Sequence, residues 1–149
     1  MSKNLYVNCK NEYSKTINEF ISNNCFFAFN QNQFEAGLKS LNIQNNEIKN
    51  KLVQIIGGGY MLKDKREEFN LLNNSYKQLI QEQIKLDQTG DGFIFGMFVY
   101  ELEDHEYGYT GDDSDTLDAL NLTIEDVLQN PALLNGLRRA KTYVQSLDL

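Results

Sequence analysis

The chain has few of the residues that mark particular protein classes. Its 149 residues include one proline, one histidine, two cysteines and no tryptophan. Because no Pro/Ser-rich linker interrupts it, we expect a single domain over residues 1–149, with residues 1–10 as a candidate flexible N-terminus. Cys9 and Cys25 are expected to stay reduced in a cytosolic protein, and neither has a histidine nearby in the sequence to make it a nucleophile. Cys25 begins the apolar run CFFAF and should lie in the core.

Long apolar segments are also missing. No run approaches the ~20 apolar residues that cross a bilayer. The first residues, MSKNLYVNCKNEYSK, lack the apolar core of a secretory signal. These absences predict a cytoplasmic protein that makes no membrane contact.

Basic residues are scarce in the second half of the chain. The net charge is −7, yet residues 1–89 hold eleven Lys/Arg and nine Asp/Glu, whereas residues 90–149 hold three and twelve. The stretch Gly90–Ala119 contains nine acidic residues, no Lys or Arg, and the single histidine, His105. Phosphate backbones require Lys and Arg, so we expect no direct nucleic-acid binding. The acidic half suits a basic protein surface or a cation, or it simply keeps the protein solvated.

Helical periodicity alternates with short apolar runs in the first half. We expect helices over residues 11–24, 31–41 and 64–86, and strands over residues 25–29, 51–56 and 60–63. The triplet Gly57–Gly59 fits a hairpin turn, because glycine accepts positive φ. It lacks the Lys-Ser/Thr pair and the following helix of a phosphate-binding P-loop. The apolar stripe of the 64–86 helix is expected to face the core.

The second half is expected to be helical. Residues 93–106 begin with a run that is apolar nearly all round, so this helix should be the most buried. A short helical turn follows over 113–120, then a helix over 124–129 with Thr123 and Asp126 as its capping box, and a last helix from Pro131 to Val144. The prediction is an α+β fold: a mostly helical single domain with a small two- or three-stranded antiparallel sheet in its first half.

A calcium loop is the first candidate site. Asp87, Thr89 and Asp91 match positions 1, 3 and 5 of an EF-hand loop, and Gly92 matches position 6. Position 12 is Phe98, where the loop needs a bidentate Glu. We therefore interpret the segment as a helix–turn–helix corner.

The second candidate surrounds His105. Glu101 and His105 are spaced i, i+4 on one predicted helix, with Asp104 beside them, and carboxylates with an imidazole can hold a divalent metal or transfer protons. The sequence does not show ligands arriving from separate elements, so we expect no metal, no cofactor and no catalytic residue, and we lean away from an enzyme. A small-ligand or metal site that also includes Tyr107, Tyr109 and Asp112, with or without hydrolysis, is the alternative.

The third candidate is a recognition surface, in which tyrosines give rigid contact area and acids steer a basic partner. The Tyr107–Asp118 loop interleaves the two residue types. Arg138, Arg139 and Lys141 of the last helix could instead neutralise this acid internally. The predicted partner-binding residues are Glu101, Asp104, His105, Glu106, Tyr107, Tyr109, Asp112, Asp113 and Asp115.

Several motifs resemble a family of small uncharacterised proteins carried by bacterial phages, plasmids and conjugative elements. They are FFAF and QFE in residues 26–35, IIGGGYMLK, the segment from TGDGFI to HEYGYTGD, and TLDALNLT with NPALLNGL. The resemblance spans about residues 25–142 and brings no assigned activity or catalytic residues. It implies an accessory protein of a mobile element in a bacterial host cell, acting against or beside host defence.

These observations favour a non-enzymatic protein that binds a basic partner through an acidic surface. The partner would be a nucleic-acid-binding defence enzyme, and the protein its inhibitor, in the manner of an anti-CRISPR. The alternatives are the small-ligand or metal site at His105 and a structural or regulatory domain whose acid only solvates it.

Overall fold

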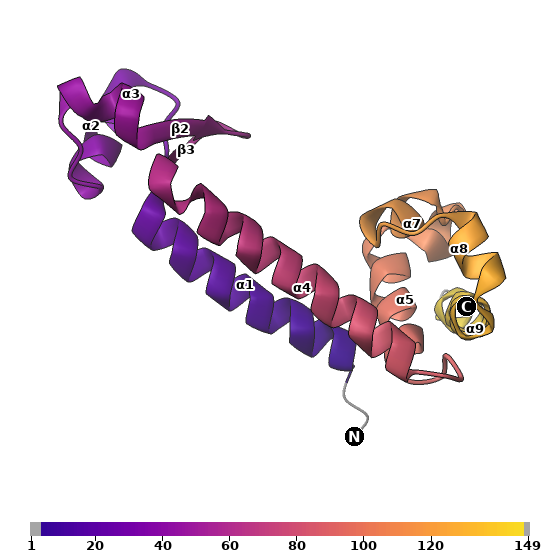
Figure 1. Cartoon of the computed structure of the whole chain (residues 1–149). Helices are drawn as coiled ribbons and strands as arrows, with labels where there is room; N and C mark the ends of the chain where they lie inside the picture. The colour runs from indigo at the N-terminus through magenta and orange to yellow at the C-terminus, as the bar shows by residue number, and fades with distance from the viewer. Residues whose placement is uncertain (1–3, 148–149) are drawn as a thin grey trace. The chain divides into compact units, whose positions relative to one another are not determined.

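The computed structural model describes residues 4–147 and confirms the predicted α+β class (Figure 1). The helices are α1 (Leu5–Asn24), α2 (Gln31–Ser40), α3 (Ile48–Lys51), α4 (Arg66–Leu86), α5 (Phe93–Asp104), α6 (Tyr107–Thr110), α7 (Ser114–Ala119), α8 (Ile124–Gln129) and α9 (Pro131–Ser146). The strands are β1 (Cys25–Phe27), β2 (Leu52–Ile55) and β3 (Gly59–Leu62). No helix in the described part of the chain combines the length and apolar character needed to cross a bilayer.

The chain divides into two compact units. The sheet unit comprises Glu12–Lys77, and the helical unit comprises Met1–Asn11 together with Gln78–Leu149. Helices α1 and α4 each contribute residues to both units. The expected single domain over the whole chain stays a prediction.

The sheet unit is built on an antiparallel sheet of order β1-β3-β2. Met61 in the central strand pairs with Cys25 on one side and Val53 on the other. Gly57 and Gly58 have φ values of 80° and 79°, so the Gly triplet makes the predicted hairpin turn. Cys25 is buried beside Phe20 and Met61, which confirms its place in a core, and burial raises the pKa of its thiol.

The first helix begins earlier than predicted. Residues 5–10, expected to belong to a flexible N-terminus, form the first turns of α1, while residues 1–3 lie outside the described residues. Tyr6 explains the difference, because its ring is buried in the helical unit and contacts Phe93 at 5.9 Å between ring centroids. The helix prediction rested on periodicity from Tyr13 onward and missed this anchor.

The prediction that the apolar stripe of α4 faces the core is only partly correct. No α4 residue is buried, and Leu79 and Leu86 are exposed. Phe69 and Leu72 pack on the edge of the sheet-unit core, whereas Ile80 packs on the helical-unit core. The stripe is therefore divided between two small cores and covered only in part.

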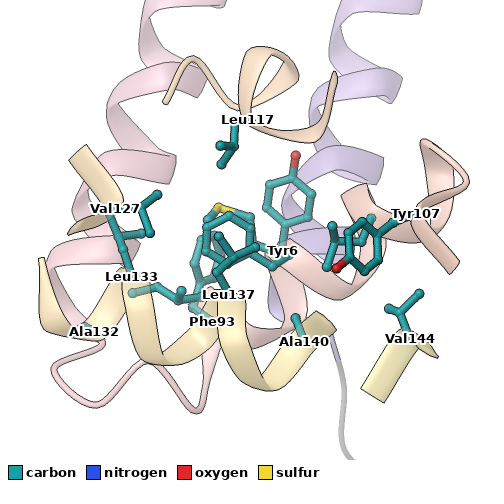
Figure 2. Close-up of a cluster of buried hydrophobic side chains, with 14 residues drawn as sticks. Tyr6, Phe93, Tyr107, Leu117, Val127, Ala132, Leu133, Leu137, Ala140 and Val144 are labelled. Atoms are coloured by element: carbon teal, nitrogen blue, oxygen red, sulfur yellow. The ribbon is translucent and has the colours of Figure 1, made fainter. Parts of the chain in front are cut away.

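The helical unit is organised around α5, as the sequence predicts. Figure 2 shows its core, in which side chains from α1, α5, α6 and α9 point toward one another. Its most deeply buried α5 residues include Met97 and Phe98. Gly136 in α9 lets the two helices approach closely: a Cβ there would lie 2.5 Å from Cγ2 of Ile94 and 2.8 Å from the carbonyl oxygen of Gly90.

Candidate functional site: an acidic segment and its pocket

The loop that resembles a calcium site is a corner that caps α5. The carboxylate of Asp87 accepts hydrogen bonds from the backbone N–H groups of Gly90 at 3.0 Å, Gly92 at 3.1 Å and Ile94 at 2.9 Å. These bonds satisfy N–H groups that have no partner within the helix. Asp91 forms an ion pair with Arg139 at 2.9 Å. Both carboxylates are therefore held by protein groups.

Glu101 belongs to the interior of the helical unit. Its side chain is 4% exposed, accepts a 2.7 Å hydrogen bond from the Tyr6 hydroxyl, and pairs with Nζ of Lys10 at 3.2 Å. Lys10 also lies over the rings of Tyr6 and Tyr100, at 5.6 and 5.4 Å from their centroids. Glu101 thus joins α1 to α5 and cannot contact a partner. The predicted place of Glu101 on the binding surface is therefore wrong, because Tyr6 and Lys10 hold its carboxylate in the interior.

His105 ends α5. Its Nδ1 lies 2.7 Å from the backbone carbonyl oxygen of Glu101, which fixes the ring, and 3.8 Å from the Glu101 carboxylate. Ligand atoms of Glu101, Asp104 and His105 all lie within 4.8 Å of one another. The structure therefore brings together three of the residues of the metal hypothesis. The neighbouring Lys10 ammonium already neutralises the Glu101 carboxylate and so weakens its attraction for a metal cation.

Tyr107 is the second residue that the structure removes from the surface. Its ring is buried and points into the core in Figure 2. Nζ of Lys141 lies 5.6 Å from the ring centroid and 2.7 Å from the Asp113 carboxylate. Of the three basic residues that could neutralise the acidic loop, Lys141 does so at Asp113, whereas Arg139 pairs with Asp91, which lies outside the loop.

The α6–α7 connection is held by Asp112. Its carboxylate accepts hydrogen bonds from the backbone N–H of Ser114 at 2.9 Å and from the Ser114 hydroxyl at 2.7 Å. The backbone bond first, and the hydroxyl bond second, hold the pKa of Asp112 below its usual value. Asp112 is exposed, and its carboxylate orders the connection between α6 and α7.

What remains is a set of exposed carboxylates on the helical unit, which we call the acidic segment (residues 103–118). It has seven acidic residues and no Lys or Arg. Asp113 is paired with Lys141, and the other six are exposed. Helices α6 and α7, which carry most of the segment, both pack against α5. The exposed acids are Glu103, Asp104, Glu106, Asp112, Asp115 and Asp118.

An open pocket of about 460 Å³ lies beside the acidic segment. Four of its six lining residues were not among the predicted site residues. Glu103 and Gly108 lie between residues that were predicted, whereas Val144 near the end of α9 and Leu147 just after it are about 40 residues away in the sequence, and α6 contacts α9 only in the folded chain. Tyr109, at 93% exposed, was predicted to face a partner and does line this open space. The lining residues are Glu103, Glu106, Gly108, Tyr109, Val144 and Leu147.

The pocket wall includes an unusual backbone position. Glu106 has φ 57°, in the left-handed region, just after α5 ends. A residue in this conformation after a helix is usually Gly or Asn. The other two non-glycine residues with positive φ in the described chain are Asn42 and Asn121. Glutamate thus stands where local geometry favours a different residue.

Comparison with known proteins yields a family and no activity. No curated protein and no solved structure matches the chain. A family model does match, over residues 6–143, which include most of both units and all of the acidic segment. The chain therefore belongs to a protein family of unknown function, DUF7659.

Proposed function

We propose that the protein is a non-enzymatic accessory protein of a phage or mobile element that binds a basic protein through its acidic segment. The observation that carries this proposal is the row of six exposed acids in residues 103–118, five of them without a hydrogen bond or ion pair to their carboxylates within residues 4–147. Neighbouring carboxylates without counter-charges repel one another, and a basic partner surface would remove that repulsion on binding.

The partner class follows from the charge and the family resemblance. Proteins that handle nucleic acids carry basic surfaces that hold phosphates. An acidic segment can occupy such a surface in place of the nucleic acid. Together with the mobile-element resemblance, this supports a nucleic-acid-handling defence enzyme of the bacterial host as the partner, and inhibition as the outcome.

Affinity capture from a host lysate tests the binding claim. The variant changes four acids of the segment to amides, while leaving the two pocket glutamates in place: Asp104→Asn, Asp112→Asn, Asp115→Asn and Asp118→Asn. A matched control removes four exposed acids elsewhere: Glu12→Gln, Glu19→Gln, Glu67→Gln and Glu82→Gln. We expect wild type and control to capture a basic protein that is released as salt screens the charges, and the segment variant to lose it. Equal capture by all three proteins would contradict the proposal.

The inhibition claim has its own assay. Plaque formation by a phage on a defended host should rise when the wild-type protein is expressed, and should not rise with the four-residue segment variant. If plaque formation is unchanged by wild type on every defended host that supplies the captured partner, the protein binds without inhibiting.

A divalent-metal site at Glu101, Asp104 and His105 is the second candidate function, favoured by the 4.8 Å grouping of their ligand atoms. A metal bound only by the folded state must raise the melting temperature. Under this candidate, Mg²⁺, Mn²⁺ or Ca²⁺ raises the midpoint over that in EDTA, and Asp104→Asn removes the rise. An unchanged midpoint with all three ions eliminates it.

A further inference from the structure

We propose that the pocket beside α6 holds one arginine side chain of the protein's partner. This inference rests on the proposed function, since it names the partner group that the acidic segment engages. The pocket's volume of about 460 Å³ lies within the ~300–1,000 Å³ range of ligand sites. It is open to solvent, so a side chain attached to a protein surface can enter.

The charge of the pocket selects a cation. Glu103 and Glu106 line it, and within residues 4–147 neither carboxylate has a hydrogen bond or an ion pair. By contrast, Asp113 of the acidic segment is paired with Lys141 of α9. The two glutamates at the pocket wall are not neutralised within the described chain, so their charge is available to a cation that enters. A phosphate or other anion is repelled there.

The apolar part of the wall selects arginine among cations. Leu147, which follows α9, and the ring of Tyr109 are both exposed, and they offer surface against which a guanidinium plane and its aliphatic stem can lie. Guanidinium stacks on aromatic rings, is weakly hydrated and binds carboxylates with two parallel bonds. A lysine ammonium is more strongly hydrated and has no plane to stack. The combination of two carboxylates with a tyrosine is therefore matched to arginine.

The backbone at Glu106 supports the same assignment. Its φ of 57° costs free energy that Gly or Asn would not. Strained positions persist where the surrounding structure enforces them, and they gather at binding sites. Here the strained residue is the one that brings a carboxylate to the pocket wall.

An NMR titration of the full chain tests the inference, with N-acetyl-arginine amide as the probe. We expect saturable shifts of the backbone amides of Gly108, Tyr109 and Leu147. N-acetyl-lysine amide should bind at least about 3-fold more weakly, and the neutral analogue N-acetyl-citrulline amide about 10-fold more weakly. Lysine binding as tightly as arginine, citrulline binding as tightly as arginine, or shifts that do not saturate would each overturn the inference.

Variants of the pocket provide the matched controls. The double variant Glu103→Gln/Glu106→Gln should abolish the saturable shifts, and Tyr109→Ala should weaken binding several-fold. Asp115→Asn/Asp118→Asn removes the same charge from α7, outside the pocket, and should bind arginine within about 2-fold of wild type. If this control loses binding as fully as the pocket variant, arginine is attracted by the overall negative charge rather than by the pocket, and the inference fails.

The two proposals fail separately. If the Glu103→Gln/Glu106→Gln variant still captures the partner from lysate at wild-type levels, the arginine pocket is refuted and the acidic-segment proposal stands. If arginine amide saturates the pocket but no basic protein is captured, the pocket assignment stands and the proposed function is refuted.

Discussion

Gly136→Ala tests whether α5 and α9 pack as closely as the structure shows. In an exposed helix, alanine in place of glycine would stabilise by ~1 kcal/mol. At Gly136 the added Cβ would lie 2.5 Å from Cγ2 of Ile94 and 2.8 Å from the backbone oxygen of Gly90. Ile94 is fully buried, so it has no open space to move into. Overpacking of this kind costs ~1–3 kcal/mol, and a backbone neighbour puts the cost at the upper end.

The two effects have opposite signs, and packing should prevail. We expect a net loss of ~1–2 kcal/mol in the free energy of unfolding, measured by urea denaturation, and a lower melting temperature by ~2–8 °C. Gly96→Ala in α5 is the matched control, because its Cβ would meet the end of the Asn4 side chain at 2.7 Å rather than a backbone atom, at the expense of the hydrogen bond that Asn4 donates to the Gly96 carbonyl oxygen. That variant should stay within ~1 kcal/mol of wild type. A Gly136→Ala protein as stable as wild type would refute the close helix contact.

Three further changes test the local interactions of the helical unit. Asp87→Ala should lower stability by ~1–2 kcal/mol by removing the cap of α5, and Ca²⁺ should not raise the wild-type melting temperature if the loop is a corner. Lys10→Met should cost ~1 kcal/mol in urea denaturation, because the buried Glu101 loses a partner that solvent already screens; no loss would contradict the pairing. Ser114→Ala should raise the pKa of Asp112 in a carboxyl NMR titration, since one of its two hydrogen bonds disappears. Because the native pKa of Asp112 is lowered, the carboxylate stabilises the fold in full above its usual pKa of 3.8, and this stabilisation is lost as pH falls through the native pKa. The free energy of unfolding of the Ser114→Ala variant should therefore fall less than that of wild type on acidification.

The parts of the fold that the sequence predicts are those set by local chemistry. Thr123 and Asp126 form the capping box of α8, as their spacing predicts. The run that begins at Phe93 is apolar on nearly all sides of the helix, so it has no polar face to turn toward solvent and must be buried. These features depend on neighbours within a few residues, which the sequence displays directly.

The parts that escaped prediction depend on contacts between distant residues. Glu101 and Tyr107 lie within an acidic, tyrosine-rich stretch, and nothing local distinguishes them from exposed neighbours. Glu101 turns inward because Tyr6 and Lys10, more than 90 residues earlier, provide partners for it. The pocket likewise needs Val144 of α9 beside α6. The composition of residues 103–118 therefore predicts an acidic surface. Which of these residues are exposed, and which line the pocket, follows only from the fold.

The affinity of the captured partner for the acidic segment is the most direct test of the proposed function. The dissociation constant would be measured at about 0.05 M and about 0.5 M NaCl for wild type, the four-residue segment variant and the four-residue control. At ~0.5 kcal/mol for each exposed charge, removing four from the segment should weaken low-salt binding by ~30-fold. The control should stay within ~3-fold of wild type, and high salt should bring all three proteins together. Equal weakening by the segment variant and the control would show that only net charge matters, and it would contradict a binding surface at residues 103–118.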